Sequence, residues 1–260
     1  MTLTPRLVIG VLIAVAVVGT FSACGDDDDV IATFSPGATR TATPSSPGAT
    51  DQPTPVPGDT TIPSDIPDQT EPPSQVTLLS VVDKLHSLSP DYTPPELAPI
   101  PGDYLAPGFS GSLRQEALAA LLQMLDTAFA AGHDIRARSA YRSYTEQEAT
   151  FQYWVDTLGY DEAMRVSAMP GHSEHQLGTA VDLTSAEVGW ELVESFGNAA
   201  SGQWLADHSI EYGFVLSYPA GSEPVTGYAY EPWHFRYIGP ASAADYAASN
   251  LYLNEYLLTQ

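Results

Sequence analysis

Residues 170–182 read Pro-Gly-His-Ser-Glu-His-Gln-Leu-Gly-Thr-Ala-Val-Asp, and the expected fold is organised around this stretch. His175 lies in a loop, and Gly178 permits a tight backbone turn before a short strand at residues 179–183. Side chains alternate along a strand, so Asp182 shares one face with Ala180. Asp182 can therefore point back toward a metal ion held by His175.

A second stretch, residues 231–237, reads Glu-Pro-Trp-His-Phe-Arg-Tyr and predicts another strand. Because side chains alternate between the two faces of a strand, the aromatic side chains of this stretch share one face, which we assign to the core. The aromatic residues are Trp233, Phe235 and Tyr237. His234 and Arg236 are left on the face that carries the candidate site.

Glu231 stands three residues before His234, a spacing that in a helix would place both on one face. Pro232 between them excludes a helical pair. Positions three apart in a regular strand face opposite ways. Glu231 therefore reaches the site only if it lies on the loop or bend that enters the strand.

Histidine and aspartate are both good zinc ligands, and a catalytic zinc site uses three protein ligands with one position open for water. His175, Asp182 and His234 supply such a set from the two stretches. His172 is an alternative ligand three residues before His175, although we expect it to be a polar loop residue.

The rest of the domain is expected to mix helices and short strands. Predicted helices cover residues 76–88, 113–131, 145–155, 161–168, 203–212 and 241–257, and predicted strands cover 134–141, 179–183, 214–218 and 233–238. Ser112 and Thr145 are the expected N-caps of two of these helices. Residues 89–108 are repeatedly interrupted by proline and should be irregular. Without regular alternation of strand and helix, we predict an α+β fold, with a small, largely antiparallel central sheet flanked by helices.

A third stretch, residues 139–144, reads Ser-Ala-Tyr-Arg-Ser-Tyr and is followed by Gln147. In order and spacing the three stretches resemble the VanY-type D-alanyl-D-alanine carboxypeptidases and their L,D-carboxypeptidase relatives. That family has an S-G-Y-R-S element followed by glutamine, an S-x-H-x-x-G-x-A-x-D element and an E-P-W-H element. The resemblance covers roughly residues 75–251. Ala140 departs from the family's glycine, a small change provided that its φ angle is not positive.

The resemblance implies a single zinc-peptidase domain over residues 76–260. It implies that zinc is bound by His175, Asp182 and His234. Glu231 would be the general base, and Arg142 would stabilise the oxyanion. Gln147 and Ser173 would help to hold the terminal carboxylate of the substrate.

The implied activity is zinc-dependent hydrolysis of the C-terminal D-alanine from peptidoglycan stem peptides, a D,D-carboxypeptidase reaction. An L,D-carboxypeptidase acting on tetrapeptide stems is the nearest alternative, because the motifs set the metal and the base but not the pocket. An endolysin-like endopeptidase and a non-catalytic cell-wall-binding module are further alternatives. Glu231 favours an enzyme over a binding module.

Charge and cysteine content limit the partners. The 260 residues contain 32 acidic and 9 basic side chains, for a net charge of -23. Nucleic-acid binding requires clustered basic residues, so we expect no nucleic-acid partner. Cys24 is the single cysteine, which excludes an intrachain disulfide.

The N-terminal residues resemble a bacterial lipoprotein signal peptide. Arg6 precedes an apolar run at residues 7–18, and small residues lead into Cys24. We expect a signal peptide at residues 1–24, with Cys24 lipidated; an uncleaved signal anchor and simple secretion are alternatives. Residues 25–75 are rich in proline, threonine and aspartate and predict a disordered linker. The domain should therefore be extracytoplasmic, membrane-anchored or in the cell wall, as a monomer that contacts the membrane only through its anchor.

Overall fold

The computed structural model describes residues 72–73 and 75–260 of the chain. The expected signal peptide at residues 1–24, with Cys24, and almost all of the expected linker lie outside the described residues. Over the described residues, every helix is too short or too polar to cross a membrane.

The centre of the fold is a four-stranded sheet in which all neighbouring strands are antiparallel. Its strands, in spatial order, are β3 (Ile135–Ser139), β4 (Ala180–Ser185), β6 (His234–Tyr237) and β5 (Phe214–Leu216). A second, two-stranded sheet pairs β1 (Leu97–Pro99) with β2 (Ser112–Arg114). The structure thus confirms the predicted α+β class with a small antiparallel sheet.

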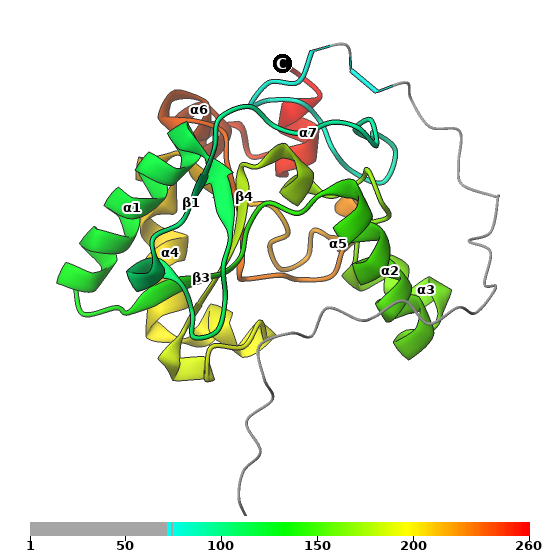
Figure 1. Cartoon of the computed structure of the whole chain (residues 1–260). Coiled ribbons are helices and arrows are strands. Elements are labelled where there is room, and N and C mark those ends of the chain that lie inside the picture. The colour runs from blue at the N-terminus through cyan, green and yellow to red at the C-terminus, as the bar shows by residue number, and fades with distance from the viewer. Residues whose placement is uncertain (1–71, 74) are drawn as a thin grey trace, which may run out of the picture. The chain divides into compact units, whose positions relative to one another are not determined.

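Helices surround this sheet (Figure 1). The α-helices are α1 (Gln115–Ala130), α2 (Tyr144–Leu158), α3 (Tyr160–Val166), α4 (Ala200–His208), α5 (Glu223–Thr226), α6 (Pro240–Ser249) and α7 (Leu253–Leu257). The 3-10 helices are η1 (Gly102–Tyr104), η2 (Glu174–Leu177), η3 (Ala186–Val188), η4 (Glu194–Asn198) and η5 (Ser209–Tyr212). In Figure 1, α1 and α4 lie on one side of the central strands, and α2 and α3 lie on the other.

The two faces of the central sheet have opposite character. On one face, Val181 and Leu183 of β4 and Phe235 of β6 are buried in the main apolar cluster, which includes Leu121 and Leu125 of α1. Burying one such side chain contributes about 1.5–3 kcal/mol. The alternating positions of β4 and β6 carry polar groups on the opposite face, as the sequence pattern predicts.

Residues 76–88 do not form the predicted helix. Arg236 Nη2 donates hydrogen bonds to the carbonyl oxygens of Leu78 (2.9 Å) and Ser80 (2.6 Å). In a helix these carbonyl oxygens would accept from backbone N–H groups of the same segment. Further along, Val82 and Leu88 pack against Leu177. Contacts with distant residues therefore outweigh the local helical pattern of this segment.

Two predicted N-caps are wrong. Ser112 belongs to β2, whose pairing with β1 delays the start of α1 until Gln115. The second helix is capped by Ser143 rather than Thr145, because Ser143 Oγ accepts a hydrogen bond from Glu146 N. The predicted last helix is divided into α6 and α7. The first of them ends before Asn250, which has a left-handed backbone conformation with a φ of 58°.

Candidate functional site

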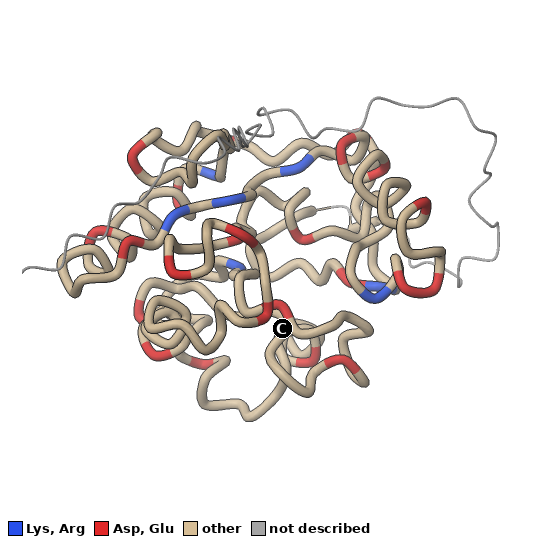
Figure 2. The backbone as a smooth tube through the Cα atoms, turned by 90° about the horizontal axis from the view of Figure 1, so that it is seen from below, with Lys and Arg blue, Asp and Glu red and all other residues tan. Residues whose placement is uncertain are grey.

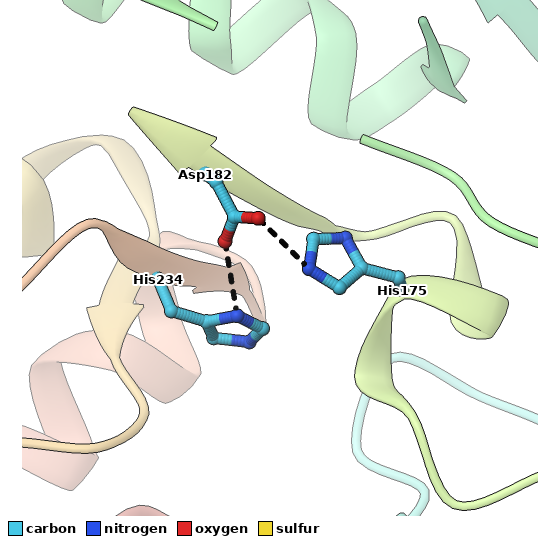
Figure 3. A group of neighbouring side chains, drawn as sticks. All are labelled: His175, Asp182 and His234. Carbon is cyan, nitrogen blue, oxygen red and sulfur yellow. Dashed lines mark ion pairs between the residues drawn. The ribbon is translucent and has the colours of Figure 1, made fainter. Parts of the chain in front are cut away.

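Three buried side chains, His175, Asp182 and His234, meet at the polar face of the sheet (Figure 3). His175 comes from η2, Asp182 from β4 and His234 from β6. His175 Nε2 lies 3.3 Å from Asp182 Oδ2, and His234 Nδ1 lies 3.2 Å from Asp182 Oδ1. One ligand atom of each residue lies within 4.8 Å of the other two. The structure therefore brings together the three residues that the sequence nominates as metal ligands.

Strand register and one turn place these side chains. Asp182 and His234 are direct partners in the antiparallel β4–β6 pair, an arrangement that brings their Cβ atoms to roughly 5 Å. The turn that carries His175 ends at Gly178, whose φ is 71°. A Cβ atom at Gly178 would approach Pro94 to 2.8 Å, so only glycine fits there without rearrangement.

Hydrogen bonds on their outer nitrogen atoms orient both imidazoles. His175 Nδ1–H donates to the carbonyl oxygen of Ala140 (2.7 Å), and His234 Nε2–H donates to Glu174 Oε2 (2.9 Å). His175 Nε2 and His234 Nδ1 then face Asp182. Burial acts to lower the pKa of His234, but Asp182 and Glu174 outweigh it and raise the pKa to about 10, so a metal ion at this place would replace a proton on Nδ1. Metal-binding histidines commonly have such a carbonyl or carboxylate partner on the second nitrogen.

The charges of the cluster suit a bound cation. Burial lowers the pKa of His175 and so favours the neutral imidazole that binds metals. Burial acts to raise the pKa of Asp182, but His175 and His234 outweigh it and hold the pKa well below its usual range. Asp182 Oδ1 is buried and accepts no hydrogen bond. A carboxylate oxygen without a partner beside two imidazole nitrogens is a donor set that fits zinc.

Glu231 lies in the turn that enters β6, as the sequence requires if it is to reach the site. Its carbonyl oxygen accepts a hydrogen bond from His234 N (3.1 Å), and its Oε2 lies 3.7 Å from His234 Nδ1. Burial raises the pKa of Glu231 to about 7, although the charge of His234 acts against the shift. A carboxyl group with this pKa can accept and return a proton near neutral pH.

Arg142 is held by neutral groups. Its Nη1 donates to Gln147 Oε1 (2.7 Å) and its Nη2 donates to Ser139 Oγ (3.1 Å). Its backbone N–H donates to the carbonyl oxygen of His175, which ties it to the metal-site turn. No carboxylate of the described residues forms an ion pair with Arg142, so its positive charge is available to a ligand.

Gln147 and Ser173 both bond to protein groups. The side-chain nitrogen of Gln147 donates to the carbonyl oxygen of Ala168 (2.7 Å), and its Oε1 accepts from Arg142. Ser173 Oγ accepts from His175 N (3.3 Å) at the start of η2. These contacts make the two residues supports for Arg142 and His175, and their roles in binding the terminal carboxylate stay predictions.

Glu174 is a residue of this site that the sequence motifs do not reveal. Its carboxylate accepts hydrogen bonds from His234 Nε2, Arg236 Nη1 (2.7 Å) and Ser217 Oγ (2.6 Å). Burial acts to raise the pKa of Glu174, but Arg236 and His234 outweigh it and hold the pKa at about 2. Arg236 is completely buried, so its role is structural. The only sequence signal for Glu174 was its position directly before His175. That position does not show which charged side chains surround its carboxylate.

The remaining loop expectations concern His172 and Ala140. His172 Nδ1–H donates to the carbonyl oxygen of Asp83 (2.7 Å), and His172 is not one of the three clustered residues. It is the polar loop residue that the sequence predicts. The φ angle of Ala140 is not positive, so alanine fits where the family has glycine.

Residues 110–240 match the VanY family, which is described as D-alanyl-D-alanine carboxypeptidase. A Bacillus subtilis protein named as a carboxypeptidase, YodJ, is 39% identical over 182 residues. The match covers 69% of this chain and 66% of the Bacillus subtilis protein. The two proteins therefore share a domain of similar sequence within longer chains.

Solved structures show the same similarity. The LdcB LD-carboxypeptidase superposes with a TM-score of 0.64 at 39% identity, covering 70% of this chain and 86% of the other. The vancomycin-resistance D,D-pentapeptidase VanY of the VanB-type cassette, solved as a mutant in complex with Zn(II), gives a TM-score of 0.57 at 30% identity. That match covers 69% of this chain and 98% of the other. Family match, fold and clustered metal-binding side chains agree, and the chain belongs to the VanY family of D-alanyl-D-alanine carboxypeptidases.

Proposed function

We propose that this chain is a zinc-dependent carboxypeptidase that removes the C-terminal D-alanine from peptidoglycan stem peptides. One observation carries the proposal: buried His175, Asp182 and His234 converge, with the carboxylate of Glu231 beside them. Zinc is proposed because these donors suit it and because the similar VanY structure is a complex with Zn(II).

His175 Nε2, the Asp182 carboxylate and His234 Nδ1 would hold the ion. When bound, zinc lowers the pKa of water from 15.7 toward about 7 and polarises a carbonyl group. The outer hydrogen bonds to Ala140 and Glu174 keep both imidazoles in the orientation that this binding needs.

Glu231 takes a proton from the attacking water and passes it to the leaving amine. A group placed in this way contributes on the order of 10²- to 10⁴-fold to the rate. Arg142 donates to the oxyanion that develops on the scissile carbonyl, and a fixed donor of this kind contributes roughly 3 kcal/mol. The hydrogen bonds from Arg142 to Gln147 and Ser139 fix its position before substrate binds.

D,D-carboxypeptidase activity is the first candidate, because the matching family is named for it. L,D-carboxypeptidase activity on tetrapeptide stems is a second candidate. It is favoured by the identity of 39% to the LdcB LD-carboxypeptidase, against 30% to the D,D-pentapeptidase VanY.

Separate digestion of pentapeptide and tetrapeptide stems tests the proposal, with mass analysis of the products. We expect loss of one terminal D-alanine, inhibition by a chelator and recovery on adding zinc. Activity that survives complete metal removal would refute the zinc mechanism. Binding of stems without turnover would favour the wall-binding module instead.

Substitution of Glu231 separates its chemical role from a structural one. Glu231→Gln should retain stoichiometric zinc and lose roughly 10²- to 10⁴-fold in kcat. The exposed Glu211 provides the control, and Glu211→Gln should keep full activity. A Glu231→Gln variant with most of its rate would assign the base to another residue.

We also propose an extracytoplasmic location, with membrane contact through lipidated Cys24 or an uncleaved signal anchor. The apolar run at residues 7–18 and the small residues before Cys24 support it. Labelling cells with a radioactive fatty acid should mark the protein, and Cys24→Ser should abolish the label. Sedimentation of the purified protein should show the proposed monomer.

A further inference from the structure

Figure 2 shows that basic residues are sparse along the backbone of this acidic protein. Their ion pairs divide them into paired and unpaired groups. Two of the nine, Arg6 and Arg40, lie outside the described residues. Four others form ion pairs with carboxylates: Arg114, Arg136, Arg165 and Arg236. Lys84, Arg138 and Arg142 form none with the described residues. Arg142 already belongs to the site, and the position of Arg138 links it to the same site.

Arg138 lies at an irregularity in the sheet beside the metal ligands. Ala137 of β3 pairs with Leu183 of β4, but the next β3 residue that pairs is Ser139, whose partner is Asp182. Arg138 is thus the extra residue of a β-bulge opposite the metal ligand Asp182. Bulges redirect side chains and occur frequently next to active sites.

Contacts within the protein fix the guanidinium of Arg138. Its central carbon lies 3.3 Å from the ring centroid of Phe109, and its Nε donates to the carbonyl oxygen of Trp190 (3.3 Å). Its two terminal nitrogens have no hydrogen-bond partner among the described residues, and the side chain is only partly buried. A guanidinium that is positioned, charged and open at its forked end is suited to a carboxylate ligand.

The two ends of β4 indicate which part of a substrate Arg138 would meet. Ser173, an expected ligand of the terminal carboxylate, lies in the turn before β4, whereas Trp190, which holds Arg138, follows the other end of β4. The leaving residue carries the terminal carboxylate and would therefore lie toward the start of β4. The acyl part of the peptide then extends toward the end of β4 and Arg138.

We propose that Arg138 binds the carboxylate of an acidic residue on the N-terminal side of the scissile bond. This inference rests on the proposed carboxypeptidase function and adds a specificity site to it. Substrates with a free carboxylate at that position are favoured over substrates in which it is amidated.

Arg136 provides a matched control on the same strand. It pairs with Asp134 through two hydrogen bonds of 2.8 and 3.1 Å, and its guanidinium lies 5.2 Å from the ring of Trp190. Arg136→Gln removes a cation from β3 without touching the forked end of Arg138. It therefore reports any general effect of lowering the positive charge near the site.

The test uses zinc-loaded protein and two stem peptides with the same D-alanine terminus, one with a free upstream carboxylate and one with that group amidated. Arg138→Gln should raise KM for the acidic peptide roughly 10- to 100-fold with little change in kcat, and leave the amidated peptide unaffected. Arg138→Lys should recover only part of the preference. Equal losses for both peptides, or the same loss in Arg136→Gln, would overturn the proposal.

Calorimetric binding of both peptides to the zinc-loaded Glu231→Gln protein separates this inference from the proposed function. If the wild type releases no D-alanine but the acidic peptide still binds more tightly in an Arg138-dependent way, the proposed function fails and the carboxylate site stands. If hydrolysis proceeds and both peptides bind equally, the carboxylate site fails and the function stands. Failure of both peptides to bind would overturn the site as well.

Discussion

At the scale of single residues, Glu174 connects the metal site to the rest of the protein. Its carboxylate joins His234 to the fully buried Arg236, and Arg236 in turn holds the carbonyl oxygens of Leu78 and Ser80. A buried ion pair contributes little net stability when intact, but removing one partner leaves an uncompensated buried charge. We therefore expect Glu174 to affect both zinc binding and folding.

We predict that Glu174→Gln weakens zinc binding by roughly 10- to 100-fold, because His234 loses its charged partner. The zinc-free variant should lose about 3–5 kcal/mol of unfolding free energy, because Arg236 stays buried without a counterion. Competition with a chromophoric chelator and urea denaturation measure the two effects.

The surface pair of Glu116 with Arg114 supplies the control for Glu174, since Glu116 is 43% exposed. Glu116→Gln should cost at most about 1 kcal/mol and leave zinc affinity unchanged. A Glu174→Gln protein that binds zinc with wild-type affinity would show that Glu174 does not position His234.

At the scale of elements, the start of α2 supports Arg142, the proposed oxyanion donor. Ser143 follows Arg142 directly, and its Oγ and N–H exchange hydrogen bonds with Glu146 in a capping box. The first turn of α2 carries Gln147, which binds Arg142. The cap of this helix therefore helps to set the position of the guanidinium.

We predict that Ser143→Ala lowers the unfolding free energy by about 1 kcal/mol, because Glu146 N loses its hydrogen-bond acceptor. Thr145→Ala, at the exposed position that the sequence pattern favours as the cap, should change it by less than about 0.5 kcal/mol. Urea denaturation of both variants measures the difference. Equal effects of the two substitutions would contradict the cap seen in the structure.

At the scale of the whole molecule, zinc would join segments that are distant in the chain. Its ligands come from η2, β4 and β6, and Glu231 lies just before β6. Such a ligand binds only the folded state, since the unfolded chain does not hold these side chains together. Zinc should therefore stabilise the domain as a whole.

We predict that a chelator lowers the thermal unfolding midpoint and that added zinc restores it. Free zinc at 1,000 times its dissociation constant would contribute about 4.1 kcal/mol, and each kcal/mol corresponds to about 2–4 °C for a domain of this size. Calorimetry measures the shift. His175→Ala should remove the response to zinc, whereas His208→Ala, on the partly exposed side chain that pairs with Glu211, should keep it. A chelator response that survives in His175→Ala would place the metal elsewhere.

The sequence by itself determined the central part of the site. The alternation of side chains along residues 179–183 and 233–238 assigned Asp182 and His234 to the polar face, because successive side chains of a strand point to opposite faces. The proline after Glu231 excluded a helix there and required the bend that the structure contains. These predictions depend on short-range geometry, which neighbouring residues specify.

Only the tertiary structure decided the features that depend on partners distant in the chain. The segment at residues 76–88 has a helical pattern, but Arg236 binds its carbonyl groups. Ser112 is drawn into β2 by β1, and Glu174 acquires its role only when His234 and Arg236 converge on it. Hydrogen-bond acceptors and buried charges interact with whichever groups lie near them in the folded chain. A local sequence pattern does not indicate which distant groups these are.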